Sequence, residues 1–139
     1  MEPRPQSVTG DSSTRPRKKD RHGFAVVLGD GKGVKVHGGP ANHLAQADEK
    51  VTWTIVNGTD RPMTVELTID RRDPPDSPAT PFTAEGPYRV ELPGKVGASS
   101  RLELRIRASG FAGESTYKYT LRVPDHPDSA LDPELDIWP

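Results

Sequence analysis

The stretch "STYKYTLRVPDHP" (Ser115–Pro127) decides the fold class of this chain of 139 residues. Up to its ninth residue, polar side chains alternate with apolar ones, and the apolar positions are Tyr117, Tyr119, Leu121 and Val123. Because successive side chains of a β-strand point to opposite faces, this alternation predicts a strand with one buried and one solvated face. A proline-flanked loop is expected to follow the strand.

Similar patterns with a two-residue period recur along most of the chain. They predict further strands at 24–28, 34–37, 50–57, 63–69, 88–92, 101–108 and 134–139. The inward-facing residues expected from the three clearest patterns are Val51, Trp53, Ile55, Met63, Val65, Leu67, Ile69, Leu102, Leu104 and Ile106. Seven or eight short strands without a long helix predict an all-β fold in which two antiparallel sheets pack as a β-sandwich.

The segments between these strands are expected to be irregular. The residues "GDGKG" (29–33) are typical of a hairpin turn, and 38–49 is expected to be a loop with room for one helical turn. The segment 70–87 holds five of the 15 prolines, so no regular element is expected there. Residues 1–22 are polar, with the basic run "RPRKKDRH", and are predicted to be a disordered tail before a single domain at 23–139.

The composition excludes several kinds of protein. The chain has no Cys, which excludes disulfides, thiolate metal ligands and a Cys nucleophile. A net charge of −1 and an aromatic content of 6% give no reason to expect specific nucleic-acid binding, and no apolar run is long enough for a membrane span. The N-terminus lacks the apolar region of a secretory signal. The chain as written is therefore expected in the cytoplasm, or in the cell envelope if an upstream signal was removed.

The segment "VTWTIVNGTDRPMTVEL" (51–67) resembles part of the cupredoxins, the blue-copper proteins of the plastocyanin type. In that family a strand with a Trp or Phe and a terminal Asn leads through a turn to Pro-His, and this His binds copper. Here Pro62 is followed by Met63, which stands at the position of the ligand His.

The opening stretch resembles a second cupredoxin segment, in which Tyr-x-Tyr-x-Cys precedes a ligand loop with His and Met. Leu121 stands at the Cys position, and His126 lies two residues later than the family spacing, with no Met after it. A blue-copper site needs two imidazoles and a thiolate. The resemblance therefore implies a cupredoxin-like sandwich without copper, and no cofactor is expected. An immunoglobulin-like sandwich is the alternative, because strands bearing Tyr and Trp occur in many sandwiches.

Two alternatives to a copper-free binding domain remain open from the sequence. His37, His43 and His126 would form a zinc or copper site if their loops met at one end of the domain. The long loops would instead hold a small molecule or glycan, with Arg71, Arg72 and Tyr88 as contacts. No nucleophile, base and orienting group stand in a recognisable motif, so we do not expect an enzyme.

The polar faces of two predicted strands are basic. Arg101, Arg105 and Arg107 alternate with apolar residues in one strand, and Lys118 and Arg122 do so in another. If these strands pair, they form a basic stripe that would receive an acidic partner. The alternative is that the charges protect an edge strand from aggregation. The sequence thus predicts a non-catalytic binding or structural module whose partner is another protein.

Overall fold

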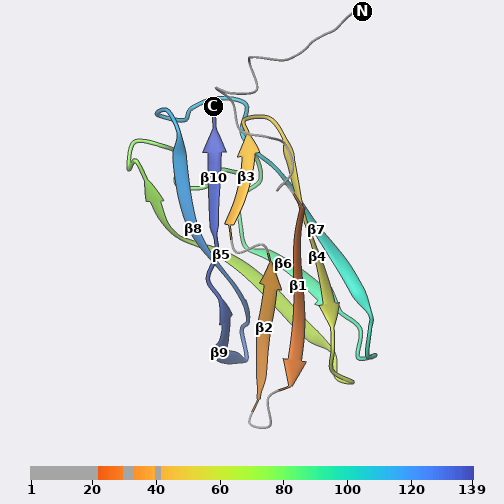
Figure 1. Ribbon diagram of the computed structural model, residues 1–139. Coiled ribbons are helices and arrows are strands. Elements are labelled where there is room, and N and C mark those ends of the chain that lie inside the picture. Colours follow the sequence, from red (N-terminus) through yellow and green to blue (C-terminus); the bar gives the residue numbers. More distant parts are fainter. Residues whose placement is uncertain (1–21, 30–32, 40–41) are drawn as a thin grey trace, which may run out of the picture.

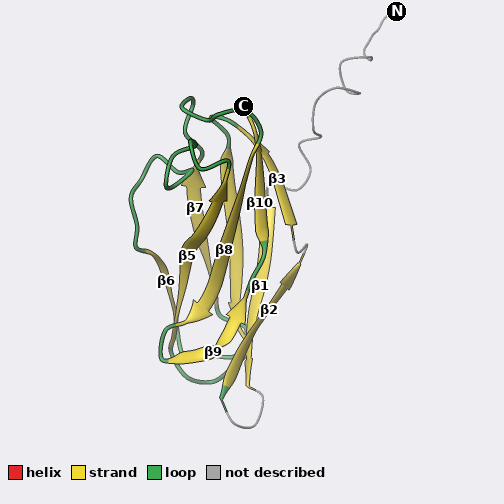
Figure 2. Cartoon of the chain, turned by 90° about the vertical axis from the view of Figure 1, so that its left-hand side faces the viewer, coloured by secondary structure: helices red, strands yellow, loops and turns green. Residues whose placement is uncertain are grey.

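The computed structural model describes residues 22–29, 33–39 and 42–139, and these fold into two β-sheets packed face to face (Figures 1 and 2). The strands are β1 (His22–Gly29), β2 (Val34–Gly39), β3 (Asn42–Gln46), β4 (Lys50–Asn57), β5 (Met63–Asp73), β6 (Tyr88–Leu92), β7 (Ser99–Arg105), β8 (Ser115–Val123), β9 (His126–Leu131) and β10 (Glu134–Trp138). In the described parts of the chain, no helix has the length and apolar character needed to cross a membrane.

The strands divide into a four-stranded sheet A and a six-stranded sheet B. Sheet A has the order β2-β1-β4-β7, and sheet B has the order β3-β10-β8-β5-β6 with β9 paired to β8. Most neighbours are antiparallel, but β1 is parallel to β4 and β3 is parallel to β10. These parallel pairs arise because the chain leaves the β1–β2 hairpin for sheet B and then returns to sheet A. The predicted all-β sandwich is confirmed, although its sheets are mixed and the described residues form ten strands.

The core lies between the sheets and is built from alternate residues of most strands. The predicted inward-facing residues of 50–57, 63–69 and 101–108 are buried, except Ile69, which packs at the margin. The indole Nε1 of Trp53 in sheet A donates a hydrogen bond to the Tyr119 hydroxyl in sheet B, at 3.1 Å. Burial raises the pKa of Tyr119 well above its ordinary value, and the hydrogen bond from Trp53 opposes this shift in part.

Two strands form where the sequence predicts loops. β3 lies inside the predicted loop 38–49, and its buried residues include His43, so a polar side chain interrupts the apolar alternation. β9 lies in the predicted proline-flanked loop, and its fully buried residue is Ser129. The Ser129 hydroxyl accepts a hydrogen bond from the Val123 amide at 2.9 Å. Apolar periodicity does not predict either strand, because a polar residue of each strand faces inward.

β5 is longer than predicted, since it continues to Asp73. A bulge after Ile69 shifts the register, and Arg71 then pairs with Lys118 of β8. The predicted tail lies outside the described residues, except His22, which is the first residue of β1. Of the predicted turn at 29–33, residues 30–32 also lie outside them, but the hairpin pairing of β1 with β2 is confirmed.

Candidate functional site

The start of β5 and the end of β8 form the region where the cupredoxin resemblance expects copper ligands. Met63 is the first residue of β5 and only 7% of its surface is exposed. Leu121 in β8 is 1% exposed and lies opposite Leu67 of β5 and Leu131 of β9. Both side chains therefore belong to the hydrophobic core.

These residues do not fit a blue-copper site. A methyl-bearing Leu side chain cannot coordinate a metal, and the thioether of Met63 is a weak ligand that lies in the core. The thiolate that defines such a site has no substitute, because the chain contains no Cys. No electron-transfer step through a copper ion of this type follows from the residues present.

A buried amide holds the turn that leads into Met63. The Asn57 Nδ2 donates to the carbonyl of Arg61 at 2.7 Å and to the carbonyl of Pro93 at 2.9 Å. Its Oδ1 accepts from the Thr59 amide at 2.9 Å and from the Thr59 hydroxyl at 2.7 Å. Asn57 is fully buried, so this terminal Asn of the family-like strand joins two loops rather than contacting a ligand.

An open pocket of about 380 Å³ lies beside this end of the sandwich. The charged groups around it carry both signs, and two of them already contact neighbours. The Arg89 Nε lies 2.7 Å from a Glu66 carboxylate oxygen, and the Thr64 hydroxyl donates to the Glu91 carboxylate at 3.0 Å. The lining residues are Arg61, Pro62, Met63, Thr64, Arg89, Glu91, Val123, Pro124, Asp125 and His126. Because these residues carry both charges, they do not indicate one chemical class of ligand.

The structure does not bring the three predicted histidine ligands together. His43 is buried, with its ring stacked on Trp53 at a centroid distance of 5.9 Å and edge-on to Tyr119 at 6.3 Å. His37 is exposed on β2, and His126 begins β9 beside the pocket. Among the described residues, no group of three or more His, Asp or Glu side chains is placed to hold a metal ion.

The predicted basic stripe is wrong in its pairing, because the two basic strands belong to different sheets. β7 is the edge strand of sheet A and pairs with β4, whereas β8 lies inside sheet B. Arg101 and Arg105 are exposed on sheet A, and the location of β7 is consistent with edge protection. Arg107 lies beyond β7, where its Nε donates to the Thr80 carbonyl at 2.9 Å.

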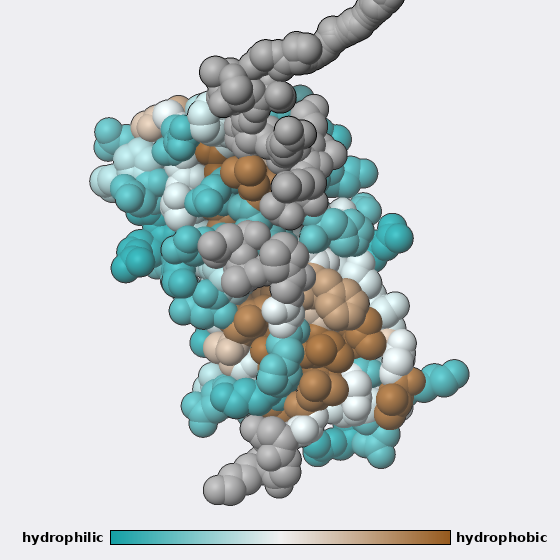
Figure 3. Space-filling view, in the orientation of Figure 1, coloured by the Kyte–Doolittle hydropathy of each residue, from teal (hydrophilic) through white to brown (hydrophobic). Residues whose placement is uncertain are grey.

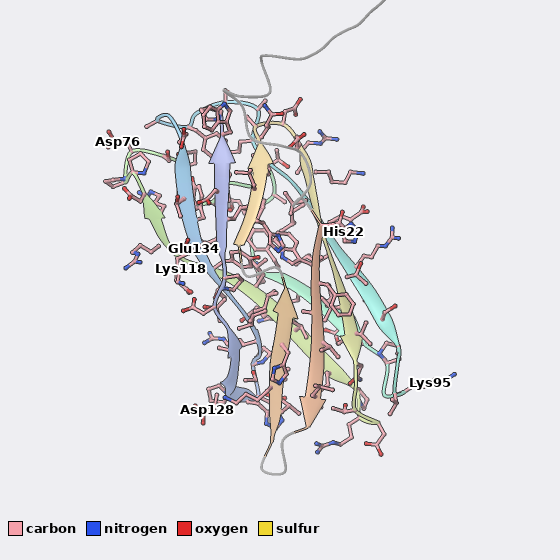
Figure 4. The ribbon with its side chains drawn as sticks, in the orientation of Figure 1. His22, Asp76, Lys95, Lys118, Asp128 and Glu134 are labelled. Atoms are coloured by element: carbon pink, nitrogen blue, oxygen red, sulfur yellow. The ribbon has the colours of Figure 1, made fainter. Side chains whose placement is uncertain are left out.

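The basic residues of β8 face acidic residues of sheet B. The Lys118 Nζ donates to the Asp132 carbonyl at 3.0 Å and lies 3.7 Å from the Asp132 carboxylate. Arg122 lies opposite Glu66 in the register of β8 and β5. Figure 4 shows Lys118 and Glu134 close together on this sheet, in agreement with their register pairing. Lys118 is therefore paired with Asp132, and Arg122 lies beside an acidic residue.

The residues proposed to contact a small molecule separate into two environments. Tyr88 is buried, and its hydroxyl donates to the Ala84 carbonyl at 2.6 Å and lies 2.7 Å from the Thr80 hydroxyl, so it is not a surface contact. Arg71 and Arg72 are exposed at the β5 bulge. They line an open pocket of about 460 Å³ together with Asp73, Thr116, Lys118 and Glu134.

One surface that the sequence pattern does not predict lies on the outer face of β1. Phe24 is 50% exposed and Leu28 is 41% exposed, while Val26 between them is half-buried. Phe24 lies between Gly39 of β2 and Thr54 of β4, and neither is large enough to cover it. Leu28 lies over Gly58, where an added Cβ would come within 2.6 Å of it. We call Phe24, Val26 and Leu28 the β1 ridge, and Figure 3 shows apolar surface gathered over this strand.

Solved structures with a similar fold include a multicopper oxidase, McoA, from the hyperthermophile Aquifex aeolicus. The match has a TM-score of 0.51 and 9% sequence identity, and it covers 96% of this chain and 32% of the oxidase. The fold is cupredoxin-like. The 2F4 variant of the same oxidase matches with a TM-score of 0.50 and 9% identity, over 85% of this chain and 29% of that chain.

The cupredoxin-like chain therefore spans about a third of the oxidase that it matches. At this level of identity the similarity concerns the fold alone. No protein-family model matches the sequence, and no curated protein matches it.

Proposed function

We propose that this cupredoxin-like domain is a non-catalytic module that binds another protein and uses no copper. The observation that carries the proposal is that the two positions equivalent to family ligands, Met63 and Leu121, are core residues. A side chain that packs between the sheets stabilises the domain and is not available to a metal or substrate. The exposed β1 ridge supports a binding role, because rows of large apolar side chains rarely stay uncovered without a function.

The proposal is tested by the metal content of protein purified without an affinity tag. We expect substoichiometric copper and zinc by elemental analysis, and no intense blue absorption after copper is added and excess metal removed. One tightly held copper or zinc ion per chain would contradict the proposal. The Leu121→Cys variant is expected to remain a poor copper binder as well, because Met63 leaves the set of imidazole ligands incomplete.

A small anionic molecule at the β5 bulge is a second candidate ligand. The pocket there presents Arg71, Arg72 and Lys118, which favour an anion, but also Asp73 and Glu134, which oppose it. Thermal-shift screening with phosphorylated and carboxylated sugars tests this candidate. A saturable increase in melting temperature that is lost in Arg71→Glu would favour it, and no shift with any of these compounds would remove it.

A further inference from the structure

We infer that the outer face of sheet A binds an acidic protein segment that also carries aliphatic or aromatic side chains. This inference rests on the proposed binding function and assigns the surface and the partner's chemistry. Its first element is the β1 ridge, where Phe24 and Leu28 stand about 13 Å apart at the ordinary rise of a strand. Phe24 pairs with Thr54 of β4, and 50% of Phe24 and 41% of Leu28 remain exposed for contact with a partner's side chains.

The second element is the charge around the ridge. Lys35 of β2 lies directly beside Leu28, and Arg101 of β7 lies in the same row as Phe24, two strands or roughly 10 Å away. Within the described residues neither cation has an ion pair or a side-chain hydrogen bond. The outward-facing charged residues of sheet A are four cations and one anion: Lys35, Lys50, Arg101, Arg105 and Glu103.

The outer face of sheet B differs from the outer face of sheet A in its apolar surface and in its charged groups. On the outer face of sheet B the acidic groups bond to neighbouring side chains. Glu66 contacts Arg89 at 2.7 Å, Asp136 accepts from Thr116 at 2.8 Å, and Asp70 accepts from Thr120. Acidic groups thus lie among the cations of sheet B, whereas sheet A combines an apolar ridge with an excess of cations. Among the described residues, Arg105 of sheet A pairs with Asp48, but Lys35 and Arg101 have no ion pair. Sheet A is therefore the better binding surface.

The charge of sheet A also selects among possible occupants. A second copy would place cations against cations, and such like-charge contacts oppose association. The segment that precedes β1, "RPRKKDR" (15–21), carries five cationic residues against one acidic residue and is repelled for the same reason. An acidic segment gains charge-assisted contacts with Lys35 and Arg101 while its apolar side chains cover the ridge.

The experiment selects binders from a random-peptide phage library on the full chain, then measures synthetic versions of the selected peptides by fluorescence anisotropy. We expect peptides that combine Asp or Glu with aliphatic or aromatic residues. Leu28→Ser and Arg101→Glu should each weaken binding by at least about tenfold. The matched controls Leu44→Ser and Arg122→Glu, on sheet B, should leave affinity unchanged. Melting curves establish that every variant is folded.

Charge reversal provides an independent readout. The Lys35→Glu/Arg101→Glu variant should select peptides rich in Lys or Arg instead. If the controls weaken binding and the sheet A variants do not, the protein binds peptides elsewhere, so this inference fails while the proposed function stands. A dimer by light scattering that dissociates in Leu28→Ser would assign the face to a second copy and overturn the inference. If no peptide is enriched, the inference and the proposed binding function both fail.

Discussion

Truncation of Leu121 to Ala tests whether this residue packs between the sheets where the family has a copper ligand. Leu121 is 1% exposed, so the truncation removes three buried carbon atoms, worth roughly 2.4 kcal/mol at about 0.8 kcal/mol per methylene group. Its neighbours Leu67 and Leu131 are held by paired strands and cannot collapse fully into the space. The residual cavity brings the expected loss of unfolding free energy to about 2–5 kcal/mol.

Urea denaturation followed by Trp fluorescence measures this loss, because Trp53 is buried in the same core. A change of about 3 kcal/mol should also lower the melting temperature by roughly 10 °C for a domain of this size. Leu28→Ala is the matched control, since Leu28 is 41% exposed and its truncation should cost less than about 1 kcal/mol. If Leu121→Ala is as mild as the control, Leu121 is on the solvent face and the strand register underlying the cupredoxin alignment is wrong.

Three further predictions concern the amide under the turn, alkaline pH and the N-terminal segment. Asn57→Ala should lower the free energy of unfolding, measured by urea denaturation, by at least about 2 kcal/mol, because the carbonyls of Arg61 and Pro93 lose the Asn57 donor. A smaller loss would contradict the role of Asn57 in holding this turn. Burial raises the pKa of Tyr119 above its ordinary value of 10.0. The tyrosine of the unfolded chain therefore ionises first, so the stabilisation contributed by neutral Tyr119 is complete below pH 10.0 and is lost as the pH rises above it. Melting temperatures between pH 8 and 12 should fall more steeply for the wild type than for Tyr119→Phe, and equal slopes would refute this attribution. Removal of residues 1–21 should leave the melting temperature nearly unchanged, whereas a loss of several degrees would show that the segment packs on the domain.

The fold class was predictable because most strands carry their own pattern. In β8 the residues from Ser115 to Val123 alternate strictly, and each apolar residue is buried as expected. β3 and β9 were not predicted because His43 and Ser129 face inward, and polar residues at inward positions give a sequence pattern typical of a loop. Periodicity reports which face of a strand is buried only when the buried residues are apolar.

The candidate surface depended on strand order, which no local pattern encodes. Arg101 and Lys118 look alike in sequence, but pairing of distant strands places them on opposite faces of the sandwich. In the same way, "FAVVL" (24–28) is apolar at every position, so the sequence does not distinguish the buried Ala25 and Val27 from the exposed Phe24 and Leu28. Ala25 and Val27 are buried because β1 pairs with β2 and β4 in sheet A, with these two side chains facing sheet B. Phe24 and Leu28 are exposed because no described layer covers the outer face of sheet A.

Copper titration followed by NMR shows whether the ligand positions of this cupredoxin-like domain are core positions. Amide spectra of the uniformly ¹⁵N-labelled chain are recorded during addition of Cu(II), with Zn(II) as a diamagnetic comparison. We expect no selective, stoichiometric broadening of the signals from Met63 and Leu121, because neither side chain is accessible or able to complete a blue-copper site. Broadening of these two signals that saturates at one copper ion per chain would contradict it.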